Sequence, residues 1–344
     1  MLELKGVTKH FRKQIAVEDV RLSILEHEFL VILGKSGAGK TTLLRIMAGL
    51  QAADSGSVWM NACDVTRQPP AERKIAYVTQ EYALYPQLTV HGNLVAALNP
   101  LRLPKAEVVR RIAEVSAWFQ IESLAARLPS QLSGGQAQRV AFAKAVVRQP
   151  SLLLVDEPLS QLDCELRGEL RRLLQTLNQR FSTTTVMVTH DPVDALSLAD
   201  RIAVMEEGHL VQIGTPDDVY RSPESPSVAG LLSPWGVNWL PLELLMVFPA
   251  FEQILSSRKT GPQGITTVGI RPEAIQCAQS QAAPIMNLLE FAVEIGEIRN
   301  LGFSQLVHAQ LGTHRLQFFA DRNASVRPGR VSVQVAKADV LLFP

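Results

Sequence analysis

Residues 34–41 decide the fold, and they read Gly34-Lys35-Ser36-Gly37-Ala38-Gly39-Lys40-Thr41. A Gly, four residues and then Gly-Lys-Thr form the P-loop pattern, in which backbone amides and a positive helix end surround phosphate groups. The apolar run Phe29–Leu33 before the loop predicts a buried strand, and Thr42–Met47 after it predicts a helix. This context favours a phosphate-binding loop over a glycine-rich surface turn, and it predicts a layered α/β fold.

The chemistry of the loop indicates ATP and Mg²⁺ as cofactors. The Lys40 amine is expected to reach the β- and γ-phosphates, and the Thr41 hydroxyl is expected to bind Mg²⁺. The other residues expected to bind the nucleotide here are Gly34, Lys35, Ser36, Gly37, Ala38, Gly39 and Thr42.

An acidic pair follows Leu152–Val155, an apolar run that predicts another buried strand. Asp156 would lie at the C-terminal end of that strand, beside the loop, where a carboxylate is needed for Mg²⁺. Glu157 is the expected general base that orients and activates the attacking water. An Asp-Glu pair after a strand is ordinarily a solvated cap, but beside a P-loop it favours a hydrolytic site.

The composition is that of an ordinary soluble globular protein. Of 344 residues 47% are hydrophobic, and 34 Lys and Arg nearly balance 33 Asp and Glu, which gives no support for nucleic-acid binding. The three cysteines are too far apart for a disulfide framework or a metal pair, and the N-terminus does not resemble a signal peptide. A reducing cytosol is therefore the expected location.

The length fits two domains. In the first, Thr185–Val188 predicts a further buried strand, and residues 87–150 predict an all-helical insertion. Four residues at helical spacing support that insertion: Val108, Val109, Ile112 and Val115.

The composition changes after Ser222–Pro226, where short alternating segments such as Phe291–Ile295 and Val331–Val335 begin to appear. We therefore expect an α/β P-loop NTPase domain over residues 1–232 and a small β-barrel, OB-like domain over residues 233–344.

The apolar segment Leu231–Phe251 contains three prolines and Glu243. A membrane span tolerates a charge near its middle poorly, so we interpret the segment as a hydrophobic junction between domains.

The stretch Leu132-Ser133-Gly134-Gly135-Gln136 narrows the family. Ser133 is a natural N-cap for the helix predicted over Ala137–Arg148, and the amides of Gly134 and Gly135 at the positive end of that helix suit a phosphate. At these residues the sequence resembles the ATPase subunits of ABC transporters, whose signature motif this is.

The resemblance implies roles for further residues. Phe11 would stack on adenine, Gln80 would contact Mg²⁺ and water, Asp163 would belong to the D-loop, and His190 would contact the γ-phosphate. It also implies a head-to-tail dimer, either a homodimer or a pair with a related chain, in which residues Ser133–Gln136 of one subunit cover the ATP held by the other. Binding of the γ-phosphate then closes the dimer and hydrolysis releases it.

Other stretches resemble the importers of this family. Val268–Glu273 and Asn238–Leu240 resemble parts of the regulatory domain of binding-protein-dependent importers, while Pro69–Arg73 and Tyr82–Pro86 resemble the maltose and glycerol-phosphate group. This implies a peripheral subunit on the cytoplasmic face of the inner (plasma) membrane, bound to permease subunits and served indirectly by a solute-binding protein.

Four residues depart from the usual family pattern, namely Thr79, Gly92, Ala137 and Lys144. None of them removes a catalytic group, but Thr79 and Gly92 lie near the expected permease groove. Importers of polyamines, iron or oxyanions share most of this plan with sugar importers. A non-transport ABC ATPase and a regulatory binding module also remain open.

Overall fold

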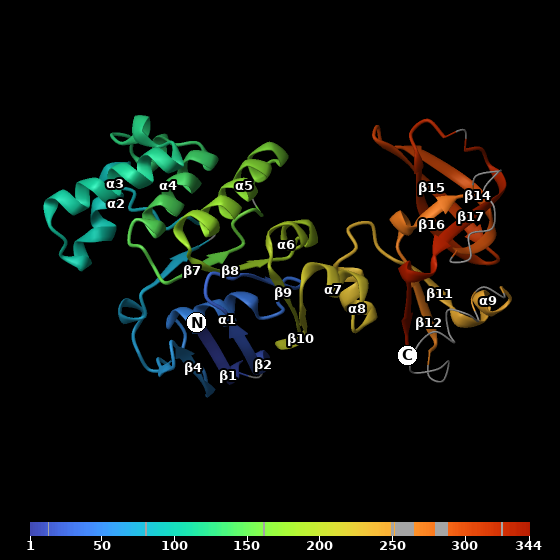
Figure 1. The fold of residues 1–344 in the computed structure, drawn as a ribbon, viewed down its shortest axis with the longest axis horizontal. Coiled ribbons are helices and arrows are strands. Elements are labelled where there is room, and N and C mark those ends of the chain that lie inside the picture. Colours follow the sequence, from blue (N-terminus) through green and yellow to red (C-terminus); the bar gives the residue numbers. More distant parts are fainter. Residues whose placement is uncertain are drawn as a thin grey trace. The chain divides into compact units, whose positions relative to one another are not determined.

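The computed structural model describes residues 1–12, 14–79, 81–160, 162–248, 251, 265–278, 288–324 and 326–344. The chain divides into two compact units, Met1–Pro216 and Asp217–Pro344 (Figure 1). The boundary suggested by the sequence, between residues 232 and 233, falls within the second unit.

A six-stranded sheet forms the centre of the first unit, in the order β10-β9-β3-β8-β7-β6. Its strands are parallel except for the antiparallel pair β9–β10. Their bounds are β3 Phe29–Leu33, β6 Ile75–Val78, β7 Leu152–Asp156, β8 Thr184–Thr189, β9 Arg201–Glu206 and β10 His209–Gly214. The three strands predicted for this unit are thereby confirmed, and every residue of β3, β7 and β8 is buried.

A second, antiparallel sheet has the order β2-β1-β4-β5. Its strands are β1 Leu2–Phe11, β2 Gln14–Ile24, β4 Ser55–Met60 and β5 Cys63–Asp64. Apolar residues of both sheets share one core with helix α1, Lys40–Ala48, which supplies Leu43, Leu44 and Met47. The helix that follows the phosphate loop is thus held between two sheets.

The buried Arg73 side chain holds the C-terminal end of α1. Its guanidinium donates hydrogen bonds of 2.9 Å to the carbonyls of both Ile46 and Met47, and of 3.0 Å to those of Thr66 and Gln68. These bonds satisfy carbonyls that the last turn of a helix leaves without partners. Burial lowers the pKa of Arg73 from its usual value.

We expect Arg73→Ala to lower the free energy of unfolding of the first unit by about 2–4 kcal/mol, because buried carbonyls lose a charged donor. The midpoint of urea unfolding measures this change. Arg73→Lys, which keeps one donor group, should lose less stability. An unchanged midpoint for Arg73→Ala would show that water replaces the guanidinium.

Residues 87–150 contain helices and no strand, and all of them are described. The α-helices are α2 Val90–Leu98, α3 Lys105–Phe119 and α4 Gly134–Val146. In α3 the side chains of Ile112 and Val115 are buried, but Val109 is 67% exposed. Val109 was therefore wrongly assigned to the apolar face, because α3 buries only a narrow stripe that continues to Phe119. Two further helices of the first unit follow β7 and β8, namely α5 Cys164–Phe181 and α6 Pro192–Leu198.

The second unit begins with helices and continues as strands. Its helices are α7 Pro216–Arg221, α8 Pro226–Leu231 and α9 Leu242–Met246. One sheet has the order β11-β12-β18, and the other has the order β13-β17-β14-β15-β16. The bounds are β11 Asn238–Pro241, β12 Thr267–Ile270, β13 Ile275–Cys277, β14 Leu288–Asn300, β15 Ser304–Leu311, β16 His314–Asp321, β17 Gly329–Ala336 and β18 Val340–Phe343. The predicted strands over 291–295 and 331–335 lie within β14 and β17.

Arg271 ties the helical start of the second unit to its strands. Its buried guanidinium donates to Ser233 Oγ at 2.9 Å and to the Tyr220 carbonyl at 2.7 Å, and it lies over the Tyr220 ring. The Tyr220 hydroxyl in turn donates to Glu273 Oε1 at 2.7 Å, and burial raises the pKa of Tyr220 to about 12. The segment resembling the regulatory-domain motif therefore joins α7 to the β-rich part.

No helix among the described residues is long and apolar enough to span a membrane. The segment interpreted as a junction, residues 231–251, includes β11 and the short helix α9, and its residues 249 and 250 lie outside the described ranges.

Candidate active site

The phosphate loop runs from β3 into α1, and its glycines are required by close contacts. A Cβ atom on Gly39 would lie 1.9 Å from the Ala16 carbonyl oxygen, and one on Gly34 would lie 2.3 Å from the Met205 carbonyl oxygen. Gly39 is also left-handed, with φ 97°, and it is the N-cap of α1. Any larger residue at these two positions would push the loop away from β2 or β9.

The Lys40 amine is held inside this loop. It donates to the carbonyls of Gly34 at 2.8 Å and Lys35 at 2.9 Å, and it lies 3.8 Å from Glu157 Oε1. Burial lowers the pKa of Lys40, although Glu157 and Asp156 oppose that shift. The amine is therefore placed at the loop centre, where phosphate oxygens are better partners than neutral carbonyls.

Asp156, at the end of β7, binds two hydroxyl groups. Thr41 Oγ1 donates to Asp156 Oδ1 at 2.9 Å, and the Tyr77 hydroxyl donates to Oδ2 at 2.7 Å. Burial and this carboxylate together raise the pKa of Tyr77. A hydroxyl and a carboxylate side by side fit Mg²⁺, which prefers oxygen ligands and is usually bound by one or two carboxylates together with substrate phosphates. The described residues contain no group of three or more His, Cys, Asp or Glu placed to hold a metal ion.

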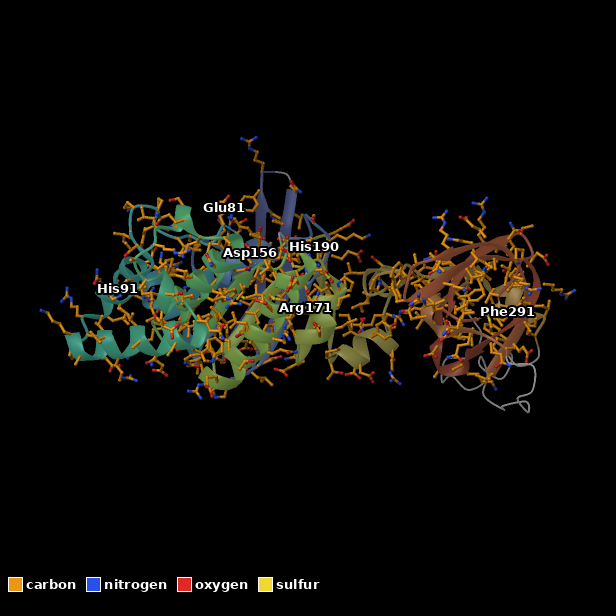
Figure 2. The ribbon with its side chains drawn as sticks, turned by 90° about the horizontal axis from the view of Figure 1, so that it is seen from above. Glu81, His91, Asp156, Arg171, His190 and Phe291 are labelled. Atoms are coloured by element: carbon orange, nitrogen blue, oxygen red, sulfur yellow. The ribbon has the colours of Figure 1, made fainter. Side chains whose placement is uncertain are left out.

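Glu157 and His190 follow neighbouring strands and meet beside the loop. Glu157 Oε2 lies 3.2 Å from His190 Nδ1, and Figure 2 labels His190 and Asp156 among the side chains of the first unit. Glu157 adopts a left-handed backbone conformation, with φ 45°, while its N–H donates to the Val188 carbonyl at 3.1 Å. A non-glycine residue in this region of φ is strained, and such strain is concentrated at functional sites. Here it accompanies a carboxylate placed between an amine and an imidazole.

A hollow of about 300 Å³ opens over the loop. It brings together eight residues predicted from the sequence: Phe11, Ser36, Gly37, Gly39, Lys40, Thr41, Thr42 and Glu157. The Phe11 side chain is 47% exposed, and the Lys9 amine lies 5.5 Å from the centre of its ring. Gly34, Lys35 and Ala38 complete the loop, and Asp156 and His190 join the site through their contacts with Thr41 and Glu157.

The signature and D-loop residues lie elsewhere. The Ser133 hydroxyl accepts from the Gln136 N–H at 3.3 Å and the Gln136 side chain accepts from the Ser133 N–H at 3.1 Å, which is a capping box at the start of α4. Asp163 caps α5 by accepting from the Leu166 N–H at 3.0 Å. None of these residues, nor Gly134 and Gly135, lines the hollow. Gln80, which we expected to bind Mg²⁺ and water, lies outside the described residues.

Sequence reasoning missed several residues of the site. Tyr77 has no motif to mark it, although its place in the strand just before the Gln80 segment was a weak signal. Gln14, Ile15 and Ala16 line the hollow because β2 passes beside the loop, and only the three-dimensional contact shows it.

Comparisons with known proteins agree with this geometry. The ABC transporter family matches residues 17–160. A sn-glycerol-3-phosphate import ATP-binding protein UgpC from Ralstonia nicotianae is 38% identical, over 99% of this chain and 95% of its own length.

Solved structures match the first part of the chain. The dimeric structure of MJ0796, a bacterial ABC transporter cassette, superposes with a TM-score of 0.57 at 32% identity, covering 63% of this chain and 99% of that one. The post-hydrolysis dimer of the same cassette, bound to ADP and Pi, gives a TM-score of 0.56 at 32% identity over the same shares. A nucleotide-binding loop, an acidic pair and a signature helix therefore occur here in a fold already known from such cassettes. The chain belongs to the family of ATP-binding, ATP-hydrolysing subunits of ABC transporters.

Proposed function

We propose that this chain powers the import of a small solute of the sugar or sugar-phosphate type through membrane permease subunits. The observation that carries the proposal is the similarity to a glycerol-3-phosphate import subunit over 99% of the chain, because it includes the second unit as well as the cassette.

In the proposed mechanism Phe11 stacks on the adenine and the loop amides bind the phosphates. Lys40 exchanges its two carbonyl partners for oxygens of the β- and γ-phosphates. Thr41 and Asp156, together with Gln80, hold Mg²⁺, which when bound neutralises charge on the phosphates. Glu157 accepts a proton from the attacking water, and His190, 3.2 Å from Glu157, orients that carboxylate and reaches the γ-phosphate.

The signature residues act on the other copy of the chain in this proposal. Ser133, Gly134, Gly135 and Gln136 lie at the start of α4, and Asp163 caps α5, so both helix N-termini can face an anion. A chain that carries both a phosphate loop and a signature helix is what a symmetric homodimer with two equivalent sites requires.

We expect Ser133→Arg to prevent ATP-driven dimerisation while the monomer still binds ATP. Arginine removes the hydroxyl cap, at a cost of about 1 kcal/mol, and places a long side chain on the surface that must close. Light scattering with and without Mg-ATP measures the mass, and Ser133→Thr, which keeps the cap, is the matched control. If Ser133→Arg dimerised at the same ATP concentration as the wild-type chain, this surface would not be part of the dimer interface.

We propose that a permease helix binds in a groove of about 380 Å³ in the first unit. Tyr82, Ala83 and Tyr85 form one wall, and Lys144 crosses to it from α4. The Lys144 amine donates to the Ala83 carbonyl at 2.8 Å and lies 3.8 Å from the centre of the Tyr85 ring. Lys144, which stands where the family usually has Arg, thus fixes the wall that a permease would touch.

Asn93 holds the same wall from α2. It is fully buried, accepts from the Tyr85 N–H at 2.8 Å and donates to the Tyr85 carbonyl at 3.1 Å. These contacts support a groove that is already formed before a partner binds.

The proposed role of the second unit is that of an OB-like, β-barrel regulatory domain. The edge strands β13 and β16 of its five-stranded sheet lie against each other, which supports closure of the sheet into a barrel. The subunit would act at the cytoplasmic face of the membrane, with a solute-binding protein on the opposite side.

The test begins with tagged Glu157→Gln protein and Mg-ATP, used to recover partners from detergent-solubilised membranes. Recovered permeases are then reconstituted with wild-type chain and assayed for ATP-dependent uptake of labelled sn-glycerol 3-phosphate and of sugars. Uptake of either supports the proposal. Uptake only of polyamines, iron or oxyanions would overturn the substrate class, and recovery of soluble partners alone, from a bait that is folded and binds ATP, would overturn transport.

A further inference from the structure

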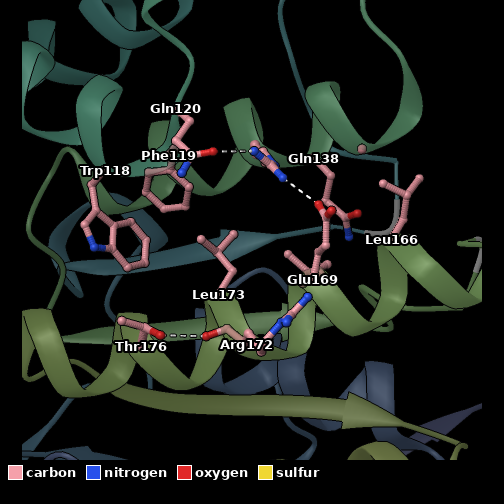
Figure 3. A pocket seen from close by; sticks show the side chains of 12 residues that line it. Trp118, Phe119, Gln120, Gln138, Leu166, Glu169, Arg172, Leu173 and Thr176 are labelled. Carbon is pink, nitrogen blue, oxygen red and sulfur yellow. Dashed lines mark hydrogen bonds and ion pairs between the residues drawn. The ribbon is translucent and has the colours of Figure 1, made fainter.

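A second hollow, of about 420 Å³, lies between α3, α4 and α5 (Figure 3). Its wall is formed by the end of α3, the first turns of α4 and the part of α5 from Leu166 to Thr176. It shares no described lining residue with the hollow over the phosphate loop, although it includes Gly135, which we assign to the ATP held by the partner copy. Its volume falls in the range of about 300–1,000 Å³ that is typical of small-molecule sites.

One side of this hollow is apolar. Phe119 and Leu170 are buried there, and Leu173 also lines the hollow (Figure 3). The Trp118 ring is fixed by edge contacts with Phe119 at 4.6 Å and Phe181 at 5.3 Å between ring centres. A planar apolar body would remove this surface from water without rearranging it.

Among the charged residues of the wall, one arginine has no acidic partner among the residues described. Arg139 and Glu169 neutralise each other through a contact of 2.6 Å, and Arg139 also donates to Gln120 Oε1 at 3.3 Å. The Arg172 guanidinium has neither an acidic partner nor a hydrogen-bond acceptor within the described part of the chain. The net charge of the wall is therefore positive, and it favours an anion beside the apolar side.

We propose that this hollow binds an organic anion with a planar apolar body, whose acidic group pairs with Arg172. Its occupant touches both α4, which begins after Ser133, and α5, which begins after Asp163. Binding therefore links the two helices whose N-termini we assign to the partner's ATP. The binding site itself does not rest on the proposed import function.

The test uses 1-anilinonaphthalene-8-sulfonate, a planar apolar molecule with one sulfonate, titrated into the full chain with Mg-ADP present to fill the nucleotide site. Fluorescence should rise with a saturable phase. Arg172→Glu, which reverses the charge, and Leu173→Trp, which fills the hollow, should each weaken this phase by at least about tenfold.

Three controls make the result specific. Arg172→Lys keeps the charge and should bind within about threefold of wild type, while Arg315→Glu makes the same charge reversal on exposed β16 of the second unit and should change nothing. N-phenyl-1-naphthylamine, which lacks the sulfonate, should bind more weakly to wild type and should not respond to Arg172→Glu. ATP hydrolysis by each variant shows that it is folded.

Wild-type affinity of the sulfonate for both Arg172→Glu and Leu173→Trp, in variants that still hydrolyse ATP, would overturn the site. A loss in Leu173→Trp alone would overturn the assignment of an anion. Arg172 is exposed, so its variants are expected to fold. They therefore still test the anion contact if Leu173→Trp does not fold.

Discussion

Replacing Glu157 by Gln is expected to lower the steady-state rate of ATP hydrolysis by about 10²–10⁴-fold, the contribution of a positioned general base. Glutamine keeps the size of the side chain and can still contact His190 and Lys40, but it cannot accept a proton from water. Its backbone must adopt the same left-handed conformation, φ 45°, at a cost similar to that of glutamate. The effect should therefore be confined to the chemical step.

Two measurements separate chemistry from binding in this variant. Phosphate release should fall while the affinity for ATP stays close to that of wild type, and light scattering should show a dimer that persists in Mg-ATP. Glu26→Gln makes the same change at an exposed residue between β2 and β3, and it should hydrolyse ATP at the wild-type rate. An unchanged rate for Glu157→Gln would remove Glu157 from the role of catalytic base.

The parts of the fold that could be predicted from the sequence are those set by local pattern. The strand predicted over Phe29–Leu33 has the same bounds in the structure, because an unbroken apolar run ends directly at the glycine-rich loop. The helix after the loop could also be predicted from local pattern. It begins at Lys40, and its apolar side chains face one core.

Contacts between segments that are distant in the sequence could not be predicted from local pattern. The need for Gly39 comes partly from the Ala16 carbonyl on β2, and Tyr77 enters the site through a hydrogen bond to Asp156, 79 residues later. Neither neighbour leaves a mark in local composition.

The boundary between the two units also depends on contacts between distant segments, which local composition does not show. Composition changes after residue 226, yet the bonds from Arg271 to Tyr220 and Ser233 draw the preceding helices into the second unit. Arg271 is one of several links, since Ala229 of α8 also packs with Leu341 and Phe343 of β18.

Lys40→Ala is expected to weaken ATP binding by at least about 30-fold, because loss of one partner of a buried charge pair costs roughly 2 kcal/mol or more. The Lys40 side chain is 4% exposed, so water cannot easily take the place of the amine beside the phosphates. ADP should lose less affinity than ATP, since it lacks the γ-phosphate. Calorimetric titration with each nucleotide measures both effects.

Lys35→Ala is the matched control, because it removes one positive charge from the same loop but leaves the backbone amide and the buried amine in place. Lys35 is exposed, and salt screens such a charge, so its loss should change the affinity by about threefold or less. Equal losses in the two variants would mean that net charge rather than the buried amine binds ATP.

The pKa of Lys40 predicts that ATP binding is coupled to proton uptake, and that Lys40→Ala abolishes this coupling. Burial lowers this pKa in the nucleotide-free protein, whereas phosphate oxygens favour the protonated amine and raise it. Between the lowered and the raised pKa, ATP binding must therefore take up a proton, and the affinity must fall as the pH rises through that interval. Titrations in two buffers of different ionisation enthalpy measure the uptake. If Lys40→Ala took up the same proton as wild type, the group that takes up the proton would be another residue of the site and not Lys40.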